Sequence, residues 1–181
     1  MLLPAASSSV GLAAIQIANL LGARPIALTL RAVKTEVLSR FGASAVLASE
    51  SQDVAAEVGR LTGGRGAELV FDRVGGQGFA QLAKATANGG TLALYGALAT
   101  DATVIPPFDI FARDLTVRGV ALTARMRDDV QLALMKRFVG DGIADGSLRP
   151  VIARTFPLDE IADAHRFIES GEQIGKVVVT P

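Results

Sequence analysis

Short apolar segments rich in β-branched residues alternate with amphipathic segments along the chain. Each apolar segment has the length of a strand that is buried on both faces of a sheet. The predicted strands cover residues 25–30, 45–47, 69–71, 91–95, 116–120 and 176–180. The predicted helices cover residues 10–21, 34–41, 54–61, 79–87, 128–139 and 158–169. Because strand and helix alternate, the sequence predicts an α/β fold, a doubly wound parallel sheet with helices on both faces in three αβα layers.

Glycines mark the ends of the first two predicted helices. Gly22 and Gly42 each follow a helix and precede an alanine, at the position where a left-handed residue commonly ends a helix. In the first helix, Val10, Ala14 and Ile17 recur at the spacing of one helix face. The repeat of strand, helix, glycine turn and strand indicates right-handed crossovers between parallel strands.

Composition excludes several kinds of partner and site. The chain has 18 basic and 18 acidic residues, so its net charge of zero gives no basic surface for nucleic acid or an anionic membrane. It has no cysteine for a disulfide or a catalytic thiol, and its single histidine, His165, cannot form a paired zinc site. No apolar segment reaches the ~20 residues of a membrane span. We therefore expect a cytoplasmic protein without a metal site, and we interpret His165 as a partly buried structural residue.

Residues 1–4 have the character of the last residues of a buried strand, with no segment before them. A central strand of such a sheet usually has ~5 to 6 residues. We therefore expect the chain to be a fragment of a longer protein, without the upstream part of that protein.

The next segment has the small residues of a loop that binds a phosphate. Of the three glycines of a dinucleotide-binding loop, only the third is present, as Gly11. The first two are replaced by Ala5 or Ala6 and by Ser8. Small residues let the backbone approach a pyrophosphate, and the start of the following helix offers free amides. The same residues also fit an ordinary helix N-cap, so this pattern alone leaves both interpretations open.

The end of the second predicted strand indicates which dinucleotide would bind. NAD sites commonly have an acidic residue ~20 residues after the glycine loop, where it accepts hydrogen bonds from the ribose. Here that region holds Thr29, Arg31 and Lys34, with no acid before Glu36. Each charge-assisted contact with a 2′-phosphate contributes ~1.5 to 3 kcal/mol, which favours NADP(H). The alternative is that both cations are solvated charges at the start of a helix.

Several motifs together are similar to those of a known family. They lie at residues 5–18 (AASSSVGLAAIQIA), 42–43 (GA), 71–76 (FDRVGG), 89–91 (GGT), 165–171 (HRFIESG) and 175–181 (GKVVVTP). Through them, and over almost its full length, the chain resembles the cofactor-binding domain of the medium-chain dehydrogenase/reductase superfamily, specifically the zinc-independent quinone oxidoreductase (zeta-crystallin-like) branch. Two departures stand out. Ser8 and Ser9 replace two glycines usual in the family, and the tyrosine that often covers the adenine is absent near Ser49.

The resemblance implies an activity and a domain organisation. NADPH would bind across the strand ends, and hydride would pass to a quinone or to an activated alkene such as an enone. Residues 1–148 would form the NADP(H)-binding Rossmann domain. Residues 149–181 would return toward a chaperonin-10-like catalytic domain that this chain lacks, which would leave the last strand without its natural partner. We expect the fragment alone to bind cofactor with little or no turnover.

The resemblance also implies where the cofactor is held. Residues 8–10 would line the pyrophosphate, Lys34 would meet the 2′-phosphate, and residues 95–97 would border the nicotinamide half. The predicted cofactor contacts are Ala6, Ser7, Ser8, Ser9, Val10, Thr29, Arg31, Lys34, Val74, Tyr95, Gly96 and Ala97. No residue is assigned a catalytic role, and we interpret Asp72 as the cap of the following turn.

The predicted strand at residues 116–120 would be an edge of the sheet, whose unpaired backbone groups need a cover. In the resembling family this edge pairs with its twin, so we predict a homodimer through the strand near Val117.

Other functions remain open from the sequence. One is a zinc-dependent alcohol dehydrogenase whose metal ligands all lie outside this chain. Another is a noncatalytic nucleotide-binding module, which the serines in the phosphate loop make conceivable. A methyltransferase is less favoured, because its acidic ribose ligand after the second strand is missing.

Overall fold

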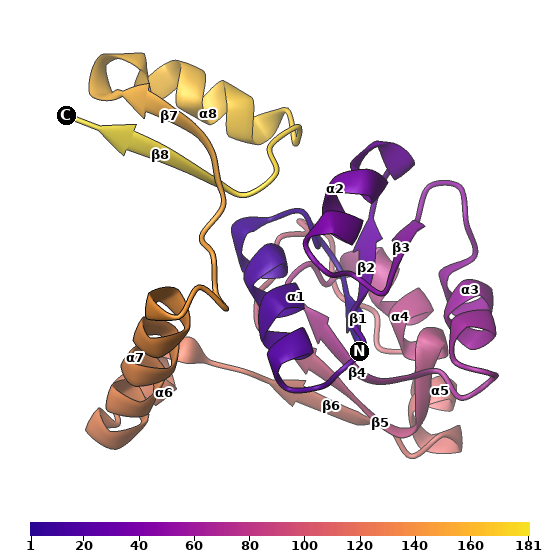
Figure 1. Ribbon diagram of the computed structural model, residues 1–181. Coiled ribbons are helices and arrows are strands. Elements are labelled where there is room, and N and C mark those ends of the chain that lie inside the picture. The colour runs from indigo at the N-terminus through magenta and orange to yellow at the C-terminus, as the bar shows by residue number, and fades with distance from the viewer.

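The computed structural model describes residues 1–181 as a six-stranded sheet, flanking helices and a smaller two-stranded sheet (Figure 1). The large sheet consists of β1 (Leu2–Leu3), β2 (Ile26–Thr29), β3 (Ala45–Ala48), β4 (Ala67–Asp72), β5 (Thr86–Leu94) and β6 (Thr116–Gly119). Its strand order is β3-β2-β1-β4-β5-β6, and every neighbouring pair is parallel. The predicted doubly wound parallel sheet is therefore confirmed.

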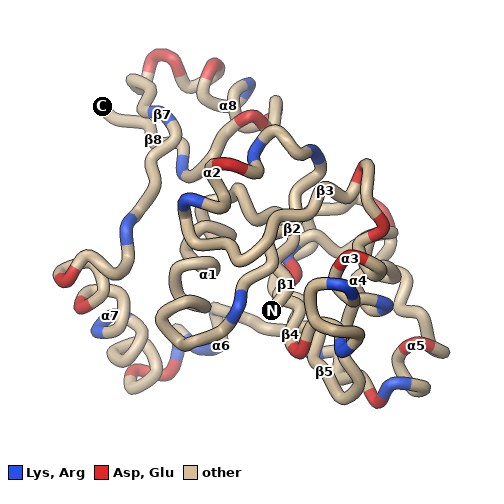
Figure 2. The backbone as a smooth tube through the Cα atoms, turned by 45° about the vertical axis from the view of Figure 1, so that its right-hand side comes forward, with Lys and Arg blue, Asp and Glu red and all other residues tan.

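Helices connect these strands and follow the last of them. They are α1 (Ser9–Leu20), α2 (Thr35–Arg40), α3 (Val54–Leu61), α4 (Phe79–Ala85), α5 (Pro107–Ala112), α6 (Leu122–Met126), α7 (Asp129–Ala144) and α8 (Ile161–Glu169). Single 3₁₀ turns lie at Ala32–Lys34, Gly76–Gly78 and Leu158–Glu160. None of the helices combines the length and the apolar character needed to span a membrane. Basic and acidic residues are interspersed along the chain trace (Figure 2).

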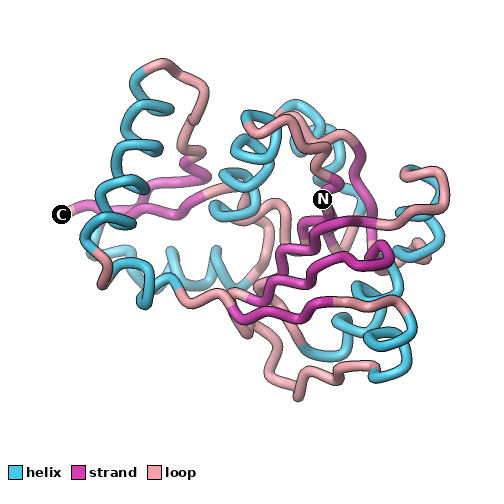
Figure 3. Tube along the Cα trace, turned by 90° about the horizontal axis from the view of Figure 1, so that it is seen from below, coloured by secondary structure: helices cyan, strands magenta, loops and turns pink.

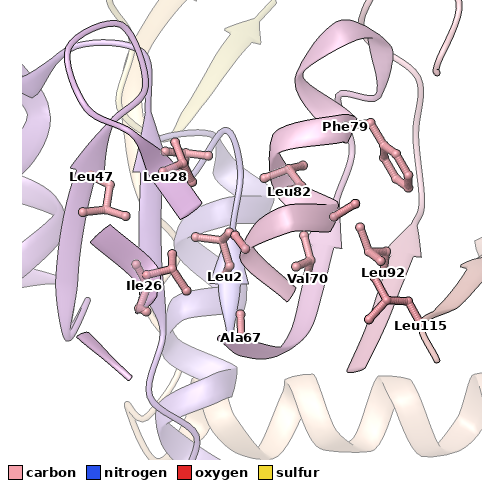
Figure 4. Close-up of a cluster of buried hydrophobic side chains, with 14 residues drawn as sticks. Leu2, Ile26, Leu28, Leu47, Ala67, Val70, Phe79, Leu82, Leu92 and Leu115 are labelled. Atoms are coloured by element: carbon pink, nitrogen blue, oxygen red, sulfur yellow. The ribbon is translucent and has the colours of Figure 1, made fainter. Parts of the chain in front are cut away.

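Alternate residues of the central strands bury opposite faces of the sheet. Leu2 and Ile26 join the cluster formed with α3 and α4, whereas Leu3 and Ala27 join the cluster formed with α1 and α2. Figure 4 shows the first cluster, in which Leu2 and its strand neighbours face side chains of α4. Both faces of the sheet are apolar because the strands are covered on both sides, as expected for a parallel sheet.

The fifth strand begins earlier than the sequence predicts. β5 starts at Thr86, so the helix predicted over residues 79–87 is two residues too long. The Thr86 hydroxyl donates to the carbonyl oxygen of Leu82 at 2.7 Å, which closes the last turn of α4. Gly89 then takes a left-handed φ of 71°, and the register with β4 shifts between Ala67 and Leu69. A glycine pair within the strand therefore marks an irregularity and not the start of the strand.

The C-terminal residues form a unit of their own beside the large sheet. β7 (Ile152–Pro157) and β8 (Lys176–Thr180) pair in parallel, with α8 between them. Seen from below, these two strands lie apart from the six-stranded sheet (Figure 3). Phe156 of β7 and Ala164 of α8 are each 2% exposed and form the small core of the unit. The last strand is thus paired within the chain, by a strand at Ile152–Pro157 that the sequence analysis did not predict.

Candidate functional site

The loop after β1 lies at the point where the connections of the sheet reverse direction. β1 pairs with β2 on one side and with β4 on the other, so the chain leaves it in one direction along the sheet and later continues in the other. In open α/β sheets, ligands bind in the crevice outside the carboxyl ends of the strands at such a point.

The backbone of this loop explains which glycine is required. Ala5 adopts a left-handed φ of 50°, a conformation that favours glycine, at the first of the predicted glycine positions. Gly11 permits close packing of α1, because a Cβ there would lie 2.5 Å from the carbonyl oxygen of Ala6. Ala6 itself is fully buried, and its side chain packs in the apolar cluster with Leu3 and Leu12.

The serines of the loop are bound to protein atoms. The Ser8 hydroxyl accepts a hydrogen bond from the amide of Gly11 at 3.1 Å and caps α1. The Ser7 hydroxyl accepts one from Lys34 at 3.1 Å. The helix-cap interpretation therefore describes the Ser8 side chain. Val10, in the first turn, is 42% exposed.

A cavity of about 880 Å³ lies over the carboxyl ends of the strands. The predicted contacts that line it are Ser7, Ser8, Thr29, Arg31, Lys34 and Val74. The predicted contacts outside its lining are Ala6, Ser9, Val10, Tyr95, Gly96 and Ala97. The cavity is also lined by residues that the sequence did not predict: Arg73, Gln77, Gln81 and the loop at residues 170–173. Arg73 lies inside the motif at residues 71–76, and residues 170–171 end the motif at residues 165–171, whereas nothing local in the sequence marks residues 172–173.

Lys34 reaches across the cavity to the C-terminal loop. Its ammonium donates to the carbonyl oxygen of Gly171 at 2.6 Å, to that of Gln173 at 3.1 Å and to the hydroxyl of Ser7. Burial lowers the pKa of Lys34 below its usual value, and the carboxylate of Glu172 acts in the opposite direction. All three ammonium protons therefore have protein acceptors.

Arg31 is paired at the rim of the cavity. Its Nε donates to a carboxylate oxygen of Glu50 at 3.1 Å, and the two side chains are 76% and 51% exposed. An exposed pair of this kind contributes only ~0 to 1 kcal/mol, so its exchange for another anion costs little. Thr29, at the end of β2, donates its hydroxyl proton to the carbonyl oxygen of Arg31.

Asp72 shapes the turn after β4. It is fully buried, and its two carboxylate oxygens accept from the amides of Val74 at 2.8 Å and Gly75 at 3.0 Å. The predicted turn cap is confirmed. Gly75 and Gly76 have φ values of 68° and 66°, which glycine adopts without strain, and Gly75 lines the cavity.

The loop after β5 continues beside this turn. The Tyr95 ring stacks on Phe71 with ring centres 3.9 Å apart, and burial raises the pKa of its hydroxyl. Leu98 donates its amide to the carbonyl oxygen of Arg73 at 3.2 Å, and Ala99 donates to that of Val74 at 3.0 Å. The two loops thus extend the pairing of β4 and β5 beyond the strands.

No three His, Asp or Glu side chains come together in a group that could hold a metal ion. His165 is exposed on α8 and does not line the cavity. The expectation that it is partly buried is therefore wrong.

The chain is similar to known proteins in both sequence and fold. The family model described as zinc-binding dehydrogenase matches residues 9–139. A 2-haloacrylate reductase from Burkholderia sp is 28% identical over 186 residues, which cover 99% of this chain and 55% of the reductase. A phenolphthiocerol/phthiocerol polyketide synthase subunit from Mycobacterium tuberculosis is 29% identical over 99% of the chain, which spans 8% of that subunit. The chain thus spans about half the length of its reductase relative and a small part of the synthase.

Two solved structures share the fold closely. A mycobacterial protein, Rv1454c, solved in complex with NADPH, has a TM-score of 0.91 and 28% identity, over 99% of this chain and 56% of its own. A structure described as an NAD-dependent alcohol dehydrogenase has a TM-score of 0.88 and 36% identity, over 99% of this chain and 50% of its own.

Proposed function

The chain belongs to the zinc-binding dehydrogenase family, and we propose that it is the NADPH-binding domain of an oxidoreductase that reduces an activated alkene or a quinone. The match agrees with the resemblance to the medium-chain dehydrogenase/reductase superfamily that the motifs indicate. The observation that carries the proposal is the cavity at the carboxyl ends of the strands, bounded by the loop after β1 and by cations at the end of β2.

The residues around this cavity fit a dinucleotide. The close approach of Gly11 to Ala6 brings the start of α1 against the loop, where its amides would hold the pyrophosphate. Arg31 and Lys34 would meet the 2′-phosphate on the side of β2. On the side of β4 and β5, Val74 would lie near the ribose, whereas residues 95–97, which we expect beside the nicotinamide half, lie outside the lining of the cavity. When bound, NADPH supplies a hydride, and a proton completes the reduced product.

The preference for NADPH rests on charge. No acidic residue stands between Thr29 and Glu36 to accept from a ribose hydroxyl, and two cations are present there. The relative solved with NADPH supports this choice, whereas the relative described as NAD-dependent requires that both dinucleotides be tested. Lys34 must give up one of its acceptors to bind a phosphate, but Arg31 has only to leave an exposed carboxylate.

The substrate proposal rests on the names of the relatives. The 2-haloacrylate reductase and an acryloyl-coenzyme A reductase from Sulfurisphaera tokodaii are named for alkenes conjugated to a carbonyl group. Such an alkene accepts hydride at the carbon farther from the carbonyl and a proton at the nearer carbon, which balances the two electrons. The competing proposal, a zinc-dependent alcohol dehydrogenase, predicts stoichiometric zinc in the complete polypeptide that contains residues 1–181. Metal analysis of that polypeptide separates the two.

Calorimetric titration with NADPH and with NADH tests the cofactor proposal. We expect tighter binding of NADPH, and we expect Arg31→Gln and Lys34→Ala each to weaken it about tenfold while changing NADH affinity much less. Arg65→Gln, which changes an exposed arginine outside the cavity, is the matched control. Equal affinity for the two dinucleotides, unchanged by either variant, would contradict NADPH selection. Binding of neither dinucleotide to the complete polypeptide would contradict the oxidoreductase itself.

A further inference from the structure

Three cations line the cavity, and two of them have protein partners. Arg31 is paired with Glu50, and Lys34 donates to three oxygens. The third, Arg73, makes no side-chain hydrogen bond and no ion pair in the structure, although it lines the same cavity and is only partly exposed. A guanidinium has five N–H donors, so a partly buried arginine without a protein partner has the donors to bind an anion.

The backbone at Arg73 is fixed from both sides. The amide of Tyr95 donates a hydrogen bond to the carbonyl oxygen of Asp72, the preceding residue, at 2.8 Å. The amide of Leu98 donates to the carbonyl oxygen of Arg73 itself. Gly96 lies against it, since a Cβ there would be 3.0 Å from the Arg73 carbonyl oxygen and 3.3 Å from its Cβ. The backbone and Cβ of Arg73 are therefore held in place without a ligand.

Neither of the two carboxylates in the cavity lining, Asp72 and Glu172, bonds to this guanidinium. Both oxygens of Asp72 accept from the turn amides of Val74 and Gly75. The other carboxylate in the lining, Glu172, lies close enough to Lys34 to raise the pKa of that residue. The end of β4 thus presents a positive charge that is not matched by a bonded anion.

Arg73 lies in the second half of the dinucleotide-binding fold. A doubly wound sheet has two mononucleotide-binding halves, and Arg31 and Lys34 follow β2 in the first half. Arg73 follows β4, so it belongs to the half that would hold the nicotinamide, next to which the substrate reacts. The 2′-phosphate and its cations are in the other half.

We propose that Arg73 binds a carboxylate group of the substrate, so that the enzyme is selective for α,β-unsaturated carboxylates over neutral quinones and enones. The inference rests on the proposed function and names its substrate class. A carboxylate joined directly to the alkene is the anion that lies close to the reacting bond, whereas the phosphates of an acyl-coenzyme A are far from it. A guanidinium binds such a group through two parallel hydrogen bonds.

Steady-state kinetics on the complete polypeptide that contains residues 1–181 test the selectivity. 2-Chloroacrylate and its neutral amide are compared in wild type, Arg73→Gln, Arg73→Lys and the control Arg65→Gln. We expect Arg73→Gln to lower the ratio of kcat/KM for the acid to that for the amide at least about tenfold, mainly through KM. We expect Arg73→Lys to restore part of the ratio and Arg65→Gln to leave it at the wild-type value. A ratio that is the same in all four proteins overturns the proposal.

A binding measurement decides the same point without turnover. The saturated acid 2-chloropropanoate and its amide are titrated into NADP⁺-loaded wild type and Arg73→Gln by calorimetry. Binding of the acid that is lost in the variant supports the proposal, even if no alkene is reduced and the proposed function fails. Equal binding of acid and amide overturns it. Weaker binding of NADP⁺ itself to Arg73→Gln, with acid selectivity intact, also overturns it and assigns Arg73 to the cofactor pyrophosphate.

Discussion

Lys34 donates a hydrogen bond to the main-chain oxygen of Gly171 at 2.6 Å, and this contact joins the 3₁₀ turn after β2 to the loop before β8 across 137 residues of sequence. Ser7 and Gln173 accept the other two ammonium protons. A phosphate that binds Lys34 must therefore replace one of these oxygens. The position of the C-terminal loop and the occupancy of the cavity are linked through a single side chain.

Loss of the Lys34 side chain should loosen the C-terminal loop. Gly175 donates its amide to the carbonyl oxygen of Ser7 at 3.0 Å, beside the Lys34 contacts. We expect faster hydrogen exchange at that amide in Lys34→Ala, measured by NMR or mass spectrometry. Lys84→Ala, on the exposed side of α4, is the control and should leave the exchange unchanged. Unaltered exchange in Lys34→Ala would mean that the backbone contacts alone hold the loop.

Glu172 should control the pKa of Lys34. Burial lowers that pKa below 10.5, and Glu172 raises it, so Glu172→Gln should lower it further. At pH values between the lowered pKa and 10.5, Lys34 is protonated in the unfolded chain but largely deprotonated in the folded one, so the unfolded chain binds more protons. The burial penalty on the ammonium is therefore relieved, and folding stability gains, as the pH rises through that window. NMR titration of the Lys34 side chain measures the shift, and a higher pKa in Glu172→Gln contradicts the expected sign.

Ala5→Gly should stabilise the protein. Ala5 has a φ of 50°, where an alanine side chain is strained and glycine is not. The strain energy that is relieved exceeds the entropic cost of glycine, which adds freedom to the unfolded chain. We therefore expect the free energy of unfolding, measured by urea denaturation, to rise by about 0.5 to 1 kcal/mol. Ala13→Gly, at an exposed position within α1, is the matched control and should lose about 0.5 to 1 kcal/mol. If both variants changed the free energy of unfolding in the same direction, Ala5 would not be strained.

Gly11→Ala should damage both stability and the phosphate loop. The new Cβ would meet the carbonyl oxygen of Ala6 at 2.5 Å, and that oxygen belongs to backbone that cannot move aside. We expect a loss of about 1 to 3 kcal/mol in the free energy of unfolding, as for other overpacked sites. NADPH affinity, measured on the folded variant by calorimetry, should fall as well. Wild-type values for both quantities would show that α1 can shift without cost.

The edge strand should mediate dimerisation. β6 is exposed along its length and pairs only with β5, so its outer backbone groups are available to a second copy. We expect a dimer in size-exclusion chromatography with light scattering. Val117→Asp would place two carboxylates near one another at a symmetric contact and should yield monomer. A monomeric wild type at micromolar concentration would contradict the prediction.

Local patterns predicted the sheet better than they predicted the site. The alternation of buried residues in β1 and β2 follows from strand geometry, and the need for Gly11 follows from helix packing, so both were visible in the sequence. The Lys34 contacts were not, because Gly171 and Gln173 offer main-chain oxygens that every residue carries. The strand Ile152–Pro157 was missed because only one of its side chains, Phe156, is buried, which leaves little apolar pattern.

Residues 149–181 make hydrogen bonds to the rest of the chain through Arg149, whose Nε donates to the carbonyl oxygen of Gly146 at 3.0 Å, and through the loop at residues 171–175. Gln16 accepts from the amide of Arg149 at 2.7 Å and donates to its carbonyl oxygen, and residues 171–175 hold Lys34 and Ser7. Next to these contacts, Val151 and Ile174 also pack against the apolar cluster that contains Leu12 and Ile15. Release of Lys34 would remove two of the three hydrogen bonds that join residues 171–175 to Lys34 and Ser7, so the βαβ unit would then be held mainly at Arg149 and by the packing of Val151 and Ile174.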